Sequence, residues 1–451
     1  MAKQKLDHFL KNPKKAIFIL AIPAMIGMFV QVMYNIVDTA YVGRLGAEAI
    51  AALTFAFPIF FILISFNSGL GMGMNSRVSR FLGAKEKKNA ENTAMHGILL
   101  SVAVAALIFG LSLIFIKPLF MLFGAEDSVL NISLDYISIV MYGIFFMFPT
   151  YMIAMIFSAQ GDTRTPTKIQ VAGLVMNIIL DPIFIYSLDY GVNGVAIATV
   201  ISILFSFLVS LYYLKKGSYL KLSMRSFSFS PKLIYEIFAI GLPASLMMIL
   251  ISIYVIFINR LMAHFGTIYV AAFGMVSRLE SVITMPVVAF SVSLLTLAGM
   301  FHGAKRFDLI KDVTSYTMKV VVGFTLISGA IFLAFPKVFL IIFTGDAELL
   351  RIGAAYLRLD VLTFPLMAIS MIISRALQGM GYGFPSLVIQ AVRIFIVALP
   401  LAYLSVYVFG FGYLSVAVAM VLGGIASSVV ALVWFEAKLK KLIEMHRVHV
   451  G

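Results

Sequence analysis

The stretch MNIILDPIF, residues 176–184, places an asparagine and an aspartate inside a long apolar run. Asn177 and Asp181 are four residues apart, so an α-helix puts both side chains on one face. A carboxylate within hydrocarbon is costly, and such residues generally face a protein interior or a wet cavity. The stretch therefore indicates a functional site, provided that its surroundings are a membrane.

The composition of the chain is that of a membrane protein. Of its 451 residues, 62% are hydrophobic and 12% are charged, and the mean hydropathy is +1.04. Soluble domains carry roughly a quarter charged residues. A soluble fold of this length could not bury so much apolar surface, so lipid must be the solvent. Cysteine is absent, which excludes disulfides and thiolate metal sites.

A hydropathy window of about 19 residues finds twelve candidate spans. The longest polar stretch between them, KKGSYLKLSMRSFSFSPK at 215–232, separates the sixth span from the seventh. We predict an all-α membrane protein of twelve transmembrane helices, with an N-terminal lobe, 1–220, and a C-terminal lobe, 221–451. The spans are expected near 16–42, 50–76, 94–122, 131–159, 168–188, 193–214, 234–262, 269–299, 314–343, 353–377, 386–408 and 412–436.

Most of the 34 lysine and arginine residues gather on one side of these spans. That side holds both termini, and the positive-inside rule makes it cytoplasmic. The formal net charge of +14 is therefore a topology signal and does not indicate nucleic-acid binding. The N-terminal segment is expected to be retained as the inner flank of the first span, in the plasma or inner membrane.

The two halves share landmarks at a nearly constant shift. At 220 residues, Pro23 meets Pro243, and FLGAK at 81–85 meets FHGAK at 301–305. Six spans per half make the halves parallel repeats about an axis normal to the membrane, an arrangement typical of secondary transporters. Each internal proline removes a helical hydrogen bond and permits a kink.

The second copy of the repeat lacks the polar side chains of the stretch at 176–184. In its counterpart, FIVALPLAY at 395–403, the proline is kept, but phenylalanine and leucine replace Asn177 and Asp181. Isoleucine likewise replaces Asp38. Because the second copy lacks these groups, we infer that the fold does not need them and that the first half uses them for another purpose.

Asp38 and Asp181 are expected in one polar cluster in the outer half of the membrane. At 1.5 Å per residue, Asp181 lies roughly 20 Å beyond Lys168 at the inner boundary. Oxygen-rich side chains there suit a hard cation or a proton relay. The candidate Na⁺ ligands are Asp38, Asn177, Asp181 and Thr199. Further polar candidates on the first span are Gln31, Tyr34 and Asn35.

Structural alternatives stay open for several of these residues. Asp38 can instead face the outer headgroups, and Asp181 can cap a helix break before Pro182. Thr199 can bond its own helix backbone, and Tyr34 can pack as a plain aromatic side chain.

Charged residues also occur in the predicted spans of the second half. Arg278 and Glu280 fall near the middle of the eighth span. They are expected to pair with each other or with polar groups elsewhere, or to form a substrate or proton site. Arg393 in the eleventh span needs a partner or a route for its charge to the membrane surface.

No enzymatic motif is present. There is no Walker A lysine motif, zincin histidine pair or catalytic triad, so we expect neither an enzyme nor a cofactor. The glycine-rich stretch GLGMGMNS at 69–76 lies at the end of a span, where we expect it to pack helices rather than bind phosphate.

Six segments together resemble the multidrug and toxic compound extrusion (MATE) family, in the prokaryotic branch related to the DNA-damage-inducible protein F, which includes archaeal members. Their order spans nearly the whole chain. The segments are IPAMIGMFVQVMYNIVDTAYVGRLGAEAIAA, FLGAKEKKNAEN, QGDTRTP, MNIILDPIFIYSLDYGVNGVAIAT, GMVSRLESVITMP and LQGMGYGFPSLVIQAVR.

The resemblance implies two pseudo-symmetric six-helix lobes around a V-shaped central cavity. It implies export of organic, often cationic and aromatic, compounds in exchange for H⁺ or Na⁺. Asp38 and Asp181 match aspartates tied to this coupling, and Tyr34, Asn177 and Thr199 match other members of that cluster. Pro23 matches a bend of the first helix, and Glu280 matches an acidic position of some relatives.

We therefore expect a cation-coupled antiporter that works by alternating access as a monomer. Its expected partners are the lipid bilayer and small organic substrates. A lipid-linked oligosaccharide flippase of the same superfamily would prefer a strongly cationic cavity. An ion channel usually gains its pore from oligomer symmetry, whereas this chain carries its own repeat.

Overall fold

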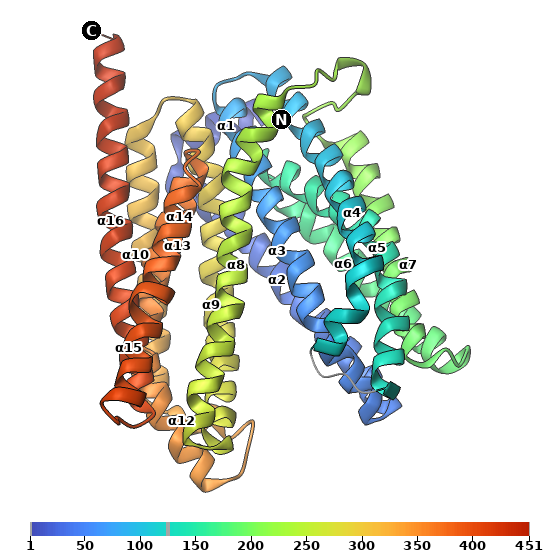
Figure 1. Ribbon diagram of the computed structural model, residues 1–451. Coiled ribbons are helices and arrows are strands. Elements are labelled where there is room, and N and C mark those ends of the chain that lie inside the picture. Colours follow the sequence, from blue (N-terminus) through green and yellow to red (C-terminus); the bar gives the residue numbers. More distant parts are fainter. Residues whose placement is uncertain (1, 123–126, 451) are drawn as a thin grey trace. The chain divides into compact units, whose positions relative to one another are not determined.

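Helices make up nearly the whole chain. The structure is a computed structural model that describes residues 2–122 and 127–450, and these residues contain no β-strand (Figure 1). Eleven of their helices are long and apolar enough to cross a membrane, and a bent pair of helices makes a twelfth span. The prediction of an all-α membrane protein with twelve spans is confirmed.

The first half follows the predicted spans closely. A short helix and two 3-10 turns lie outside these spans: α1 (Ala2–Lys11), η1 (Gly43–Leu45) and η3 (Met224–Ser226). The spanning elements are α2 (Pro13–Val42), α3 (Ala47–Gly83), α4 (Lys87–Leu122), α5 (Asp127–Ala159), α6 (Arg164–Pro182) with the π-helical turn η2 (Ile183–Ser187), and α7 (Gly191–Gly217).

The second half contains more breaks. Its elements are α8 (Pro231–Phe265), α9 (Thr267–Gly303), α10 (Phe307–Ala334), α11 (Pro336–Leu340), α12 (Ala347–Asp360), α13 (Thr363–Gly379), α14 (Phe384–Ala391), η4 (Val392–Ala398), α15 (Leu399–Tyr403), η5 (Leu404–Val408) and α16 (Leu414–Val450).

Two predicted spans differ from the structure. The span expected at 314–343 ends at Ala334, because Pro336 drives Phe335 out of the helical region, to φ −125° and ψ 49°. The span expected at 353–377 consists of α12 and α13, which are bent by 45° at the break directly after Asp360.

Internal contacts divide the chain into two compact units. The first unit is mainly Ile22–Leu82 and Glu86–Gly241, and the second is mainly Leu6–Ala21 and the chain from Leu242 onward. The first nine residues of α2 thus belong to the second unit, and the first eleven residues of α8 belong to the first. Each boundary falls one residue before a proline of the repeat. The lobes 1–220 and 221–451, and a hinge at Pro23, stay predictions.

The glycine-rich stretch at 69–76 lies on α3 and packs against the N-terminal half of α8. A Cβ at Gly73 would overlap the carbonyl oxygen of Ile237, and a Cβ at Gly241 would lie 2.9 Å from the carbonyl oxygen of Gly69. Small residues allow such close backbone approach between membrane helices. The prediction of a packing role for this stretch is confirmed.

We expect Gly73→Ala to lower the midpoint of thermal unfolding, because the backbone of α8 must move to admit the methyl group. Overpacking of this kind costs about 1–3 kcal/mol. The matched control is Gly110→Ala in α4, where a Cβ meets nothing within 4 Å. Alanine favours helix over glycine, so the control keeps or raises the midpoint. Equal midpoints for the two purified variants would contradict the close packing.

Candidate functional site

Glycines bring α6 and α7 close together around the predicted polar cluster. A Cβ at Gly173 of α6 would overlap the Oγ of Ser206 on α7. A Cβ at Gly194 of α7 would lie 2.6 Å from the carbonyl oxygen of Phe184 in η2. Because neither glycine has a side chain, α7 packs tightly along α6 and η2.

Asn177 and Asp181 of α6 form the centre of the cluster. Both side chains are fully buried, and Nδ2 of Asn177 donates a hydrogen bond of 3.0 Å to Oδ1 of Asp181. Asp38 of α2 interacts directly with both of them. The structure thus brings together two acids that are far apart in the sequence. Two ionised carboxylates side by side repel each other, so a proton or a cation shared between them would stabilise the pair.

Several buried oxygen atoms of the cluster have no hydrogen-bond partner among the described residues. An unpaired buried polar atom costs about 1–3 kcal/mol, so the arrangement favours a group that satisfies these oxygens. Hard cations bind oxygen ligands, and the predicted Na⁺ ligands therefore fit such an ion. The unpaired atoms are Oδ1 of Asp38, Oδ2 of Asp181, Oδ1 of Asn177 and the hydroxyls of Tyr34 and Thr199.

A cation here would depend on neutral oxygens as well as on the acids. The described residues contain no group of three or more His, Cys, Asp or Glu side chains that could hold a metal ion. The amide of Asn177 and the hydroxyl of Thr199 would therefore have to complete a shell begun by two carboxylates.

The same contacts decide between the open alternatives for two residues. The hydroxyl of Thr199 makes no hydrogen bond to its own helix. The carboxylate of Asp181 accepts from Asn177, while α6 continues into η2 without a side-chain cap. Neither residue has the purely local role that the sequence left open.

Tyr136 belongs to the cluster, although the sequence analysis did not single it out. It is buried on α5 and lies beside Asp38 and Asp181. Tyr34 lies beside Thr199. A signal for both tyrosines was available, because the shift of 220 residues places tyrosines at the corresponding positions 254 and 356.

The other candidates on α2 have different surroundings. Gln31 and Asn35 are exposed, so they lie outside the buried part of the cluster. Pro23 is connected to α6, because the hydroxyl of Thr167 donates a hydrogen bond of 2.6 Å to the carbonyl oxygen of Pro23.

The second unit contains a charged cluster of its own. Glu280 of α9 and Asp360 of α12 interact electrostatically with each other and with Arg393 of η4. Asp360 is 2% exposed, and its Oδ2 has no hydrogen-bond partner among the described side chains. A Cβ at Gly423 of α16 would overlap the carbonyl oxygen of Arg393, so close packing fixes η4 against α16.

This cluster selects one of the partners left open for Glu280 and adds an acid that the sequence analysis missed. Arg278 is exposed, and the cation that interacts with Glu280 is Arg393. Asp360 was missed, although it is the only acid in the window 353–377. In the structure, the helix that carries Asp360 is interrupted directly after this acid. The second half therefore also buries acids, on helices other than those used by the first half.

Comparison with known proteins agrees with this architecture. The MatE family model matches residues 23–183 and 243–404, and the two matched segments begin at the paired prolines of the repeat. The probable multidrug resistance protein YoeA of Bacillus subtilis is 28% identical over 402 residues, with 86% of each chain covered. The FAD transporter of Shewanella oneidensis is 29% identical over 408 residues, with 87% of this chain and 88% of the relative covered.

Solved structures are similar over almost the full length. A crystal structure of a MATE protein in the bent conformation matches with a TM-score of 0.93 and 30% identity, covering 96% of this chain and 97% of the other. Two repeated halves, twelve spans and two matched family segments lead to one conclusion: the chain belongs to the MatE family of membrane transporters.

Proposed function

We propose that the chain is a secondary active antiporter that exports organic compounds in exchange for H⁺ or Na⁺. The observation that carries this proposal is the contact between Asp38 and Asp181, surrounded by buried oxygens without partners. A ligand shifts a conformational equilibrium only by binding one state more tightly. Loading the cluster with an ion would therefore favour one arrangement of the first unit, and unloading would favour another.

The proposal extends to cargo and orientation. The names of the relatives favour organic compounds, including drugs, as the exported cargo. The positive-inside rule supports cytoplasmic termini in the cell membrane. Within the second unit, Lys14 lies 3.7 Å from Asp312, and Lys311 lies 3.1 Å from Glu436. These ion pairs connect the start of α2 and the C-terminal half of α16 through the start of α10, which supports termini on one side.

We expect Asp38→Asn and Asp181→Asn each to lower gradient-driven efflux at least roughly tenfold, because an amide can neither take up a proton nor supply a negative charge to a cation. The measurement uses proteoliposomes loaded with a fluorescent organic cation, under an imposed proton or sodium gradient. The matched control is Asp189→Asn. Asp189 is exposed and has φ +56°, a conformation that asparagine adopts readily. Full coupled efflux in both cluster variants would refute the assignment.

The effect of sodium on thermal stability, and its dependence on the neutral candidate ligand Thr199, distinguishes Na⁺ from H⁺ as the coupling ion. If Na⁺ is the coupling ion, NaCl should raise the thermal unfolding midpoint relative to choline chloride. At a hundredfold excess over Kd the stabilisation is about 2.7 kcal/mol. Thr199→Val removes one oxygen and should shift the sodium concentration needed for this effect at least roughly tenfold upward. If H⁺ is the coupling ion, sodium should have no effect in either protein. A sodium effect that survives in Asp38→Asn with Asp181→Asn would exclude the cluster as its site.

We further propose that Arg393 stabilises the second unit by balancing Glu280 and Asp360. Removing one partner of a buried charge group costs about 3–5 kcal/mol, because the other charges remain unpaired. Arg393→Met should therefore lower the thermal midpoint strongly, and adding Glu280→Gln should recover much of the loss. Arg278→Met is the control, since Arg278 is exposed. Equal effects of Arg278→Met and Arg393→Met would contradict the balancing role.

A further inference from the structure

The linker between α7 and α8, residues 218–230, is fastened to the first unit at its start. Oε1 of Gln160 accepts a hydrogen bond of 2.8 Å from the backbone N–H of Tyr219. Oε1 of Glu91 on α4 accepts one of 2.7 Å from the backbone N–H of Lys221. The start of the linker is therefore held by a side chain of α4 and by Gln160, which directly follows α5.

Two side chains of α4 hold the end of the same linker. Nδ2 of Asn92 donates to the carbonyl oxygen of Ser228 at 2.8 Å, and Oδ1 of Asn92 accepts from the N–H of Ser228 at 3.0 Å. Nε2 of His96 accepts from the N–H of Ser230 at 3.0 Å. A segment held at both ends keeps its orientation, so its outward side chains form a fixed surface.

Large apolar side chains lie on that surface. Met224 is 64% exposed and Phe229 is 69% exposed, and Tyr235 at the start of α8 is 72% exposed. The linker begins directly after α7 and ends where α8 begins, so it lies at the membrane surface. Aromatic side chains are favoured at that level, where apolar and polar surroundings meet.

The cations of this region have no acidic neighbours in sequence. No aspartate or glutamate occurs between Asp189 and Glu236. Each lysine or arginine near an anionic leaflet contributes about 1 kcal/mol of attraction. The five cations of the segment are Lys215, Lys216, Lys221, Arg225 and Lys232.

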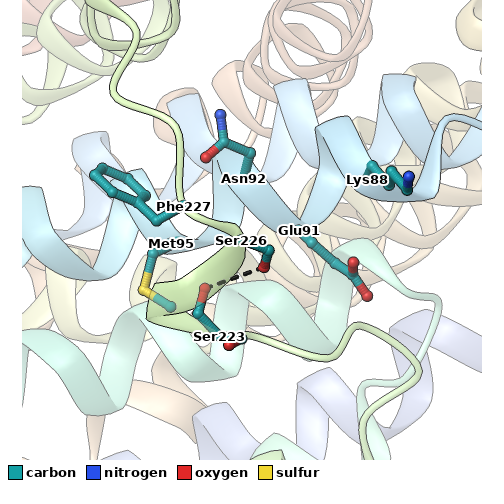
Figure 2. A pocket seen from close by; sticks show the side chains of 7 residues that line it. All are labelled: Lys88, Glu91, Asn92, Met95, Ser223, Ser226 and Phe227. Atoms are coloured by element: carbon teal, nitrogen blue, oxygen red, sulfur yellow. Dashed lines mark hydrogen bonds between the residues drawn. The ribbon is translucent and has the colours of Figure 1, made fainter.

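A cavity of about 320 Å³ lies between α4 and the linker (Figure 2). Lys88 and Glu91 lie at one end of it, and Met95 and Phe227 lie at the other (Figure 2). The charge of Glu91 is already compensated, because its Oε1 lies 3.5 Å from the Nζ of Lys87. The polar end therefore offers the ammonium group of Lys88, and Ser223 and Ser226 complete the lining.

We propose that this linker is a docking surface for an anionic phospholipid of the adjacent leaflet. The lipid phosphate binds at the polar end of the cavity beside Lys88, and the exposed linker cations Lys221 and Arg225 attract it. The acyl chains pass over Met224 and Phe229. The linker connects the two halves of the chain, so a bound lipid would stabilise the start of α8 on the first unit.

A tryptophan reporter tests the proposal. The chain has one tryptophan, Trp434, so Trp434→Phe with Phe229→Trp gives a single fluorophore on the linker. The protein is reconstituted in mixed phosphatidylcholine and phosphatidylglycerol, with brominated acyl chains on only one lipid at a time. We expect brominated phosphatidylglycerol to quench the reporter more strongly than brominated phosphatidylcholine at equal mole fraction.

The charge variants separate a specific site from general attraction. Lys221→Gln with Arg225→Gln removes two exposed cations without touching the backbone bonds, and should lower the preference for phosphatidylglycerol roughly tenfold or more. Lys440→Gln with Lys441→Gln on α16 changes the net charge equally and should leave the preference intact. Equal quenching by the two brominated lipids would overturn the proposal. An equal loss of preference in both charge variants would overturn it as well.

Discussion

The cost of burying like charges in a medium of low dielectric constant governs both units of this protein. Asp38 and Asp181 meet in the first unit, and Glu280 and Asp360 interact in the second. The second unit supplies Arg393 as a fixed counter-charge. The described part of the first unit places no lysine or arginine beside its acids, and leaves oxygens unpaired instead. Arg393 thus balances the acids of one cluster permanently, whereas the acids of the other have no lysine or arginine beside them among the described residues.

The backbone geometry follows from the need to bring such groups together. The glycines of α6 and α7 remove the side chains that would separate the two helices, and Pro182 leads into the π-helical turn η2. In the second unit, Arg393 lies in the π-helical turn η4. A π-helical turn re-aims the residues of a helix and is often found at functional sites. Arg393 of the second cluster thus lies on a π-helical turn, whereas Asp38 and Asp181 of the first cluster lie on regular helices and η2 begins just after them.

Hydropathy and residue spacing predicted the transmembrane helices better than the contacts between side chains of different helices. The apolar runs determine the spans, and the spacing of Asn177 and Asp181 determines their shared face. Neither pattern reveals which distant side chains meet. The sequence therefore left open whether Glu280 pairs with its neighbour Arg278 or with a distant group, and tertiary packing brings it to Arg393. The break after Asp360 also escapes hydropathy, because a hydropathy window averages over α12 and α13 and does not report the backbone direction.

Comparison of the two halves of the repeat distinguishes the residues that both halves share from those that occur in only one half. Tyrosines occupy equivalent positions in both halves, as Tyr34 with Tyr254 and as Tyr136 with Tyr356. In each unit they lie beside the buried acids, although the acids come from different helices. A tyrosine buries an aromatic ring and still offers a hydroxyl, so it tolerates either a polar or an apolar neighbour. The two tyrosines of each half therefore form a site beside which a buried acid can lie, whichever helix carries that acid. In this way one repeated fold can contain two charge clusters that are built from different helices.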